Sequence, residues 1–401
     1  MTQNTLRLGF VGLGQAAQHI IAELRQAQES PWKIAAAADP RAHARDAFAR
    51  EFGGPVFADA ADLCRLSDVD AVYIATPPWL HRAHVEIAAE CGKHIICEKP
   101  MALSIADCDA MVAAAKRHGI MLMAGHTHSF DAPVRKIEEL VAGGKVGNLH
   151  AINSWNCNEF QHRSRLTAEL EATRGPILNQ GPHQIDIVRQ IGGGLVRSVR
   201  AQTIMDGISR VEGGYVAWLD FESGVPATLV YDGRSLFDTA ELFGWLGESG
   251  QARDPGLARK RRTTYREIAS LPEEAREARL EAEKEQGRYG AGAVHDGRGI
   301  DGPLQQPFFG LLLVHCEEAT IRQSPDGLYL YTDKGREELK LAREARGRMA
   351  ELAELHASIT SGRPPFHDGA WGTATLEVCF AIMESAAKRA DISMTRQVAS
   401  R

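Results

Sequence analysis

The sequence has no uninterrupted apolar run of about 18 residues, the length that a membrane-spanning helix requires. It also has no excess of basic residues, because 46 lysines and arginines against 52 aspartates and glutamates give a formal net charge of −6. A basic surface for nucleic acid or anionic lipid is therefore not expected. These absences predict that neither a membrane nor a nucleic acid is a partner of this protein.

The seven cysteines are odd in number and scattered, and none of them forms a C-x-x-C pair. This pattern is typical of reduced thiols in a cytoplasmic protein rather than of a disulfide framework or a zinc cage. The N-terminal residues lack the apolar core and the cleavage site of a signal peptide, so we expect no targeting segment. His126 and His128 have no carboxylate or cysteine companion at metal-ligand spacing, so they are interpreted as structural residues or cleft wall, and no metal is predicted.

The 401 residues present correspond to roughly two to three domains. From residue 6 to about 124, short apolar strands alternate with helices, which is typical of a parallel sheet covered on both faces. After about residue 125, strand-like runs follow one another closely, which indicates a large, mostly antiparallel open sheet. We therefore predict an α/β fold, with one domain at residues 1–125 and an α+β domain at residues 126–401.

Residues 248 to about 301 differ from the rest of the second domain. By count they contain 11 basic and 11 acidic side chains, many glycines and little apolar material. This composition predicts a solvated insertion, either a lid or a partly disordered loop, outside the core. The basic run Arg259–Arg262 is interpreted as a solvated face, since glutamates nearby compensate its charge.

The first predicted strand, residues 6–11, ends in a turn of the pattern G-x-G-x-x-A. In such a turn the first glycine permits the tight bend, and the second lets the backbone approach a pyrophosphate held by helix amides. Asp39 follows Ala17 by 22 residues, the position of an acid that accepts the ribose hydroxyls. Asp39 favours NAD, although Arg41 can accommodate the 2′-phosphate of NADP. The predicted Rossmann domain thus has a cofactor site that includes Gly12, Leu13, Gly14, Gln15, Ala16, Asp39 and Arg41.

Three further segments complete a recognisable pattern. Thr76-Pro77-Pro78 with His81 follows the predicted strand 71–75, and Glu98-Lys99-Pro100 follows the strand 94–97. A G-x-H-x-x-D sequence, Gly181 to Asp186, opens a helix in the second domain. With the glycine-rich turn, these segments resemble the glucose–fructose oxidoreductase, inositol dehydrogenase and rhizopine catabolism family of NAD(P)-dependent oxidoreductases, over essentially the whole chain.

The resemblance implies roles for individual residues. Lys99 would lie beside the nicotinamide and polarise the substrate oxygen, commonly with a cis bond to Pro100, and His183 would accept a proton. The chain departs from many sugar- and inositol-oxidising members, which have an aspartate where Asn179 stands, four residues before His183. An amide cannot stabilise an imidazolium as a carboxylate does, so Lys99 is the stronger candidate proton acceptor, with His183 orienting or sharing the proton. The resemblance also assigns to cofactor binding Thr76, Pro77, His81, Glu98 and Lys99.

Within the family, the second half is similar to phthalate 4,5-cis-dihydrodiol dehydrogenases, in residues 165–170, 179–189, 308–314 and 367–378. The implied reaction is NAD-dependent oxidation of 4,5-dihydro-4,5-dihydroxyphthalate, an aromatic dihydrodiol carboxylate, to 4,5-dihydroxyphthalate. Because the net charge of the protein opposes a dicarboxylate, local arginines must attract it. The expected substrate-binding residues are Lys99, Arg163, Arg165, Arg174, Asn179 and His183.

Two alternatives remain open. The first is a sugar- or inositol-type dehydrogenase on the same scaffold, against which Asn179 argues. The second is a nucleotide-sensing protein without turnover, against which the presence of both Lys99 and His183 argues. The resemblance further implies a homo-oligomer, a dimer or a tetramer, formed through an exposed sheet face of the second domain.

Overall fold

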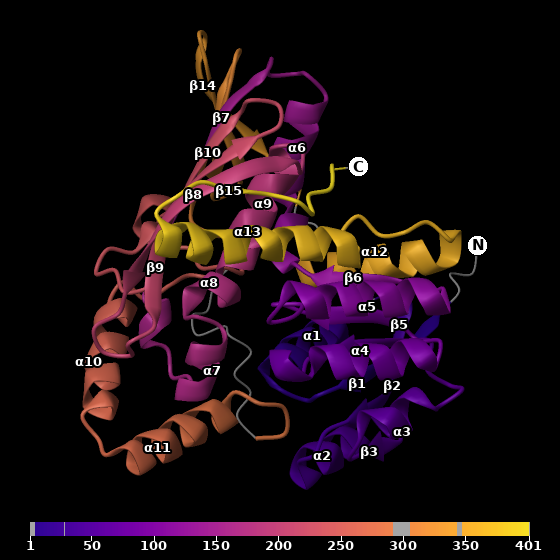
Figure 1. Ribbon diagram of the computed structural model, residues 1–401. Helices are drawn as coiled ribbons and strands as arrows, with labels where there is room; N and C mark the ends of the chain where they lie inside the picture. Colours follow the sequence, from indigo (N-terminus) through magenta and orange to yellow (C-terminus); the bar gives the residue numbers. More distant parts are fainter. Residues whose placement is uncertain (1–4, 28, 292–304, 343–346, 401) are drawn as a thin grey trace. The chain divides into compact units, whose positions relative to one another are not determined.

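The computed structural model describes residues 5–27, 29–291, 305–342 and 347–400 (Figure 1). The chain divides into two compact units. The first contains Met1–His126, Ala282–Asp296 and Arg348–Thr373, and the second contains Thr127–Glu281, Gly297–Gly347 and Ala374–Arg401. The predicted contiguous domain at residues 126–401 therefore differs from the structure, because two of its segments pack with the first unit. Trp32, for example, donates from Nε1 to the carbonyl oxygen of Leu352 at 2.8 Å.

The first unit is built on a six-stranded sheet of order β3-β2-β1-β4-β5-β6, in which all the neighbouring strands pair in parallel. Its central strands β1 and β4 are neighbours although β2 and β3 lie between them in sequence, so the order reverses there. Ligands of such sheets bind at this switch point, beyond the carboxyl ends of the strands. The strands are β1 (Leu6–Val11), β2 (Trp32–Ala38), β3 (Val56–Phe57), β4 (Ala71–Ile74), β5 (His94–Glu98) and β6 (Leu122–Gly125).

Helices cover this sheet, and α4 and α5 lie side by side (Figure 1). Helix α5 begins with a side-chain cap, because the Ser104 hydroxyl accepts the Asp107 amide at 3.1 Å. The same helix ends before Gly119, whose φ is +66°. The helices are α1 (Gln15–Gln26), α2 (Ala42–Phe52), α3 (Ala60–Cys64), η1 (Pro78–Leu80), α4 (His81–Glu90), α5 (Ile105–His118) and α12 (Gly347–Ser361).

The second unit is built on a nine-stranded sheet of order β14-β13-β12-β11-β7-β10-β9-β8-β15. Only the β7–β10 pair among these strands is parallel, so the prediction of a mostly antiparallel sheet is confirmed. The strands are β7 (Leu149–Cys157), β8 (Val196–Met205), β9 (Glu212–Phe221), β10 (Pro226–Asp232), β11 (Leu311–Cys316), β12 (Thr320–Ser324), β13 (Gly327–Thr332), β14 (Gly335–Lys340) and β15 (Ile392–Ser393).

Helix α9 packs against β7 and β10, and every one of its residues is buried. No helix in the described parts of the chain is long and apolar enough to cross a membrane. The remaining helices are η2 (Thr127–Phe130), α6 (Ala132–Ala142), η3 (Phe160–His162), α7 (Thr167–Ala172), α8 (Pro176–Asn179), α9 (Gly181–Ile191), η4 (Thr239–Phe243), α10 (Leu257–Ala269), α11 (Glu273–Gln286) and α13 (Gly369–Lys388).

The charged insertion at 248–301 is more ordered than its composition predicted. Its described part contains α10 and α11 rather than a disordered loop, and a role as a lid stays a prediction; residues 292–301 lie outside the described residues. A few apolar side chains account for this difference, because they are buried, whereas the charged residues of the described part are partly or fully exposed. The buried side chains are Tyr265, Ile268, Leu280 and Tyr289.

Candidate active site

The glycine-rich turn joins β1 to α1 at the carboxyl edge of the first sheet. Gly12 has a φ of +90°, and a Cβ there would lie 3.0 Å from the backbone of Ala75, so a larger residue does not fit. Gly14 is the N-cap of α1, and a Cβ at this position would meet only the Ala75 carbonyl oxygen, at 3.6 Å. Because Gly14 has no side chain to cap the first amides of α1, the turn fits a pyrophosphate.

Asp39 connects the end of β2 to this turn. Its Oδ2 accepts the Leu13 amide at 2.7 Å, and its Oδ1 accepts the Arg41 amide at 2.9 Å. The Arg41 guanidinium spans the two carboxylate oxygens, at 2.9 and 3.0 Å. Burial acts to raise the pKa of Asp39, but the hydrogen bonds from Arg41 and Leu13 bring it below its usual value. The residue is therefore an ionised acceptor, which fits the ribose hydroxyls of NAD.

The loop after β4 contains the predicted cofactor residues Thr76, Pro77 and His81. Pro77 is exposed and Thr76 is half-buried, but His81 is only 1% exposed. The His81 Nε2 lies 2.8 Å from the Thr76 carbonyl oxygen, and its Nδ1 lies 3.1 Å from that of Pro100. Both ring nitrogens of His81 therefore hold the loop after β4 against the loop after β5, and a direct contact of His81 with the cofactor stays a prediction.

The Glu98-Lys99-Pro100 segment follows β5, and its Lys99–Pro100 peptide bond is cis, as the resemblance implies. The Glu98 side chain accepts the Tyr73 hydroxyl at 2.5 Å and the Arg348 guanidinium at 2.6 Å, and it also accepts the Lys99 amide at 3.2 Å. Burial acts to raise the pKa of Glu98, but the charges of Arg348 and Lys99 lower it to about 2. The Glu98 carboxylate is thus occupied by groups of the protein, and the cofactor role of Glu98 stays a prediction; Lys99 beside it is half-buried.

Arg348 is a functional residue that sequence reasoning missed. It lies in α12, 250 positions from Glu98, and it also donates to the Tyr73 hydroxyl at 2.9 Å. No local pattern marks an arginine of this kind, because the pairing depends on the packing of a distant helix.

In the second unit, His183 lies in the first turn of α9 and is 7% exposed. The centre of its ring is 4.8 Å from that of His128, edge to face, and Phe309 lies against both rings. His128 Nδ1 lies 3.0 Å from Asp131 Oδ2, and both side chains are largely buried. Burial raises the pKa of Asp131, and the hydrogen bond with His128 acts against that shift. A carboxylate that accepts from Nδ1 selects the imidazole tautomer whose Nε2 can accept a proton.

His128 was interpreted from sequence as structure or cleft wall, and the structure instead places it beside His183 with a carboxylate behind it. The signal was present in the sequence, since His128 and Asp131 are three residues apart in a helical turn. Asn179, the last residue of α8, accepts the side-chain amide of Gln180 at 2.9 Å. Among the described residues, no group of three or more metal-ligating side chains lies together.

The three predicted substrate arginines have different surroundings. Arg174 makes a bidentate pair with Glu212, at 3.1 and 3.0 Å from its Nε. Arg163 lies 3.3 Å from both Glu159 and Glu248. These two guanidinium groups are already paired with carboxylates, which argues against the predicted substrate contacts; those contacts stay predictions.

Arg165 differs from both. Its guanidinium lies over the Phe160 ring at 4.5 Å, and its Nε is buried without a hydrogen-bond acceptor among the residues that the structure describes. Burial, together with the nearby charge of Arg163, lowers the pKa of Arg165 to about 10. A buried donor that lacks an acceptor is costly, and an anionic ligand would relieve that cost.

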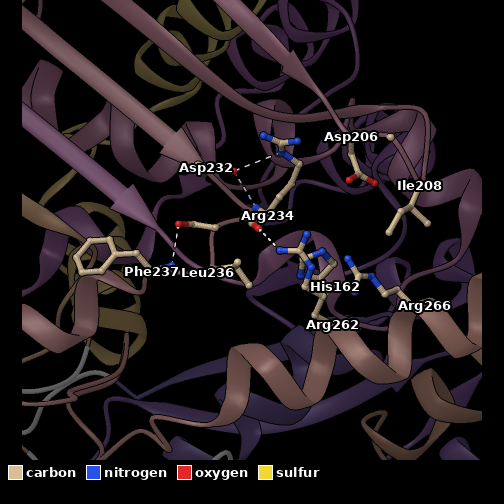
Figure 2. A pocket seen from close by; sticks show the side chains of 11 residues that line it. His162, Asp206, Ile208, Asp232, Arg234, Leu236, Phe237, Arg262 and Arg266 are labelled. Carbon is tan, nitrogen blue, oxygen red and sulfur yellow. Dashed lines mark hydrogen bonds and ion pairs between the residues drawn. The ribbon is translucent and has the colours of Figure 1, made fainter.

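A pocket of about 560 Å³ in the second unit is shown in Figure 2. It is lined by Arg234, Arg262 and Arg266 together with acidic and apolar side chains. The Arg234 guanidinium lies 3.4 Å from Asp232, and Arg262 donates to the Arg234 carbonyl oxygen at 3.4 Å. None of the predicted site residues lines this pocket, so we do not assign the substrate to it.

Comparison with known proteins gives matches along most of the chain. The model of a family described as an oxidoreductase family with an NAD-binding Rossmann fold matches residues 6–126, and that of the GFO/IDH/MocA C-terminal domain matches residues 134–250. The chain is 32% identical over 383 residues to 1-carboxy-3-chloro-3,4-dihydroxycyclohexa-1,5-diene dehydrogenase of Comamonas testosteroni, which covers 94% of each chain.

Solved structures agree with this fold. A putative dehydrogenase from Bordetella bronchiseptica RB50 is 35% identical, with a TM-score of 0.87 over 97% of this chain and 100% of that one. An oxidoreductase from Agrobacterium radiobacter, in complex with NAD⁺, L-tartaric acid and magnesium, is 20% identical, with a TM-score of 0.71 over 97% of this chain and 98% of that one. The second likeness shows the shared fold alone.

Proposed function

Because the chain belongs to the GFO/IDH/MocA family of NAD-dependent oxidoreductases, we propose that it oxidises a cis-dihydrodiol of an aromatic carboxylic acid. The substrate is 4,5-dihydro-4,5-dihydroxyphthalate and the product is 4,5-dihydroxyphthalate. The similarity to the Comamonas enzyme supports this proposal, since its name describes a carboxylated dihydroxycyclohexadiene. The observation that carries it is Arg165, whose buried Nε has no acceptor in the described part of the chain.

The reaction sets two requirements for the protein. When bound, NAD supplies the acceptor for the hydride that leaves the ring carbon. The chain must stabilise the negative charge that develops on the hydroxyl oxygen, and it must take the hydroxyl proton. Lys99 provides the positive charge. Glu98 accepts the backbone amide of Lys99, and Arg348 donates to the Glu98 carboxylate. The first product is a ketone that tautomerises to a catechol, so aromatisation makes the oxidation effectively irreversible.

This chain has Asn179 where many family members have an aspartate near the catalytic histidine. Asp131 provides a carboxylate beside another histidine, His128. With Asp131 at its Nδ1, His128 is an oriented base whose positive charge would be stabilised once it takes a proton. We therefore assign proton acceptance to the pair of His183 and His128, and charge stabilisation to Lys99. Glu248 interacts electrostatically with both His128 and Arg165. This supports the proposal that the base and the arginine that binds the substrate carboxylate lie near each other in the second unit.

The first test is a substrate panel followed at 340 nm, with Arg165→Ala beside wild type. We expect turnover of the phthalate dihydrodiol and none of inositol or aldoses. Arg165→Ala should raise the KM for the dicarboxylate by about tenfold to a hundredfold, the value of one or two charge-assisted hydrogen bonds, and leave the KM for NAD⁺ unchanged. Arg174→Ala is the matched control, because Glu212 already pairs with that guanidinium. Equal changes in both KM values, or faster turnover of a polyol, would contradict the proposal.

We also propose that the protein forms a homo-oligomer through the second sheet. Trp155 lies on β7, and Val216 and Trp218 lie on β9, the two strands on either side of β10; each of these side chains is between 46% and 49% exposed. Burial of such an apolar surface is the usual source of association energy. Light scattering at micromolar concentration is expected to give the mass of a dimer or tetramer, and the mass of one chain would contradict this.

We also propose a cytoplasmic location, which the seven unbridged cysteines support.

A further inference from the structure

Residues 282–291, named here the return segment, come from the charged insertion but belong to the first unit. The Tyr289 amide donates to the carbonyl oxygen of Leu13 at 3.3 Å, and Leu13 lies in the glycine-rich turn. Gly287 approaches the same turn, because a Cβ at this position would collide with the side chain of Gln15. A segment far away in the sequence therefore lies directly on the turn that fits the pyrophosphate.

The return segment is held against α2 and α1. Tyr289 is 2% exposed, its ring centre lies 6.2 Å from that of Phe48, and its hydroxyl donates to Glu51 at 2.6 Å. At Gly290, which has a φ of +85°, a Cβ would lie 3.1 Å from the Cα of Ala44. A buried aromatic anchor and two close backbone approaches define a fixed position, so side chains of this segment have defined places around the cofactor turn.

One of these side chains, Glu285, reaches the predicted cofactor residues. Its carboxylate lies 3.1 Å from Nη1 of Arg41, 2.9 Å from Nε2 of His43 and 2.5 Å from Nη1 of Arg288. Burial acts to raise the pKa of Glu285, but Arg288, Arg41 and His43 bring it below its usual value, so the group is ionised at neutral pH.

Arg41 is consequently engaged at all three guanidinium nitrogens. Nε and Nη2 bind Asp39, Nη2 also donates to the Leu13 carbonyl oxygen at 2.8 Å, and Nη1 binds Glu285. The arginine that is suited by position to a 2′-phosphate is therefore held between two carboxylates. A dianionic 2′-phosphate would have to displace Glu285 from Arg41 and then remain close to both negative charges.

We propose that Glu285 is a cofactor-selectivity residue, which together with Asp39 occupies Arg41 and so excludes the 2′-phosphate of NADP. The charged insertion thus contributes to the binding site of the adenosine ribose. This role does not depend on which alcohol the enzyme oxidises.

The test is direct calorimetric titration of the full-length protein with NAD⁺ and with NADP⁺, which needs no turnover. Glu285→Gln should tighten NADP⁺ binding by about tenfold, since removal of one like charge beside a phosphate is worth at least that much. The dissociation constant of NAD⁺ should change by less than about threefold, because NAD lacks the phosphate. Glu274→Gln, at an exposed position of the same helix, is the control for the change in net charge.

Arg41 provides the second arm of the experiment. In the double variant Arg41→Gln/Glu285→Gln, the gain in NADP⁺ affinity should disappear, because the released guanidinium is its source. Three results would overturn the proposal: an unchanged ratio of the two dissociation constants in Glu285→Gln, an equal gain in Glu274→Gln, or a gain that persists in the double variant. Equal weakening of both dinucleotides would give Glu285 a purely structural role and would overturn it as well.

Discussion

Replacement of Lys99 by methionine is expected to lower kcat by about a thousandfold, since loss of one group that stabilises developing negative charge costs 10²–10³ or more. Methionine retains the length and the apolar stem of lysine and removes only the charge. The dissociation constant of NAD⁺, measured by titration, should remain within about threefold, because the pyrophosphate and ribose contacts lie elsewhere in the first unit.

The surroundings of Lys99 make this substitution a clean test. The Glu98 carboxylate accepts hydrogen bonds from Arg348, Tyr73 and the Lys99 amide, and the substitution removes none of these three donors. Lys116→Met is the matched control, at an exposed position in the last turn of α5. If Lys99→Met turns over the dihydrodiol like wild type, Lys99 is not in the active centre and the proposed mechanism fails.

The second large effect is expected at His128. Its replacement by alanine should lower kcat/KM by about 10²–10⁴, the range for loss of a positioned general base. Asp131→Asn should have a similar effect, because an amide no longer fixes the tautomer that leaves Nε2 able to accept a proton. His118→Ala, an exposed histidine at the end of α5, is the control.

Comparison of the two substitutions separates this role from a structural one. Asp131→Asn preserves the size of the side chain, so it should lower kcat/KM and leave the melting temperature close to that of wild type. A packing role for His128 would lower the melting temperature of His128→Ala and leave kcat/KM of Asp131→Asn near the wild-type value. That outcome would agree with the interpretation of His128 as a structural residue.

Some features of this protein follow from short-range rules. The glycine-rich turn and the cis bond after Lys99 are present where local sequence or family resemblance predicted them. Each depends on backbone conformation or on groups within a few residues, and the family match over both parts of the chain agrees with them. The parallel and antiparallel sheets were also predictable, because the spacing of apolar runs differs between them.

The hydrogen-bond partners of the predicted site residues were not predictable from such short-range rules. Arg163, Arg165 and Arg174 are chemically alike in the sequence, and only their acceptors, which include Glu212 on β9 and Glu248, separate them. Glu98 and His81 follow the expected motifs, yet their polar atoms are taken by partners from other loops and from α12. Side-chain role depends on which groups the fold brings within hydrogen-bond distance, and sequence separation carries little information about that.

The charged insertion shows most clearly the difference between what composition predicts and what tertiary contacts decide. Its composition indicated solvent exposure, and the charged residues of its described part are partly or fully exposed. Tyr289 nevertheless fixes the return segment on α2, and Glu285 thereby reaches Arg41 across 244 positions of sequence. The amino-acid sequence alone determined that this chain has a dinucleotide-binding turn and the residues of an oxidoreductase. The tertiary structure alone decided which carboxylate faces which cation, because in a folded chain proximity in space, and not in sequence, sets the strength of an electrostatic interaction.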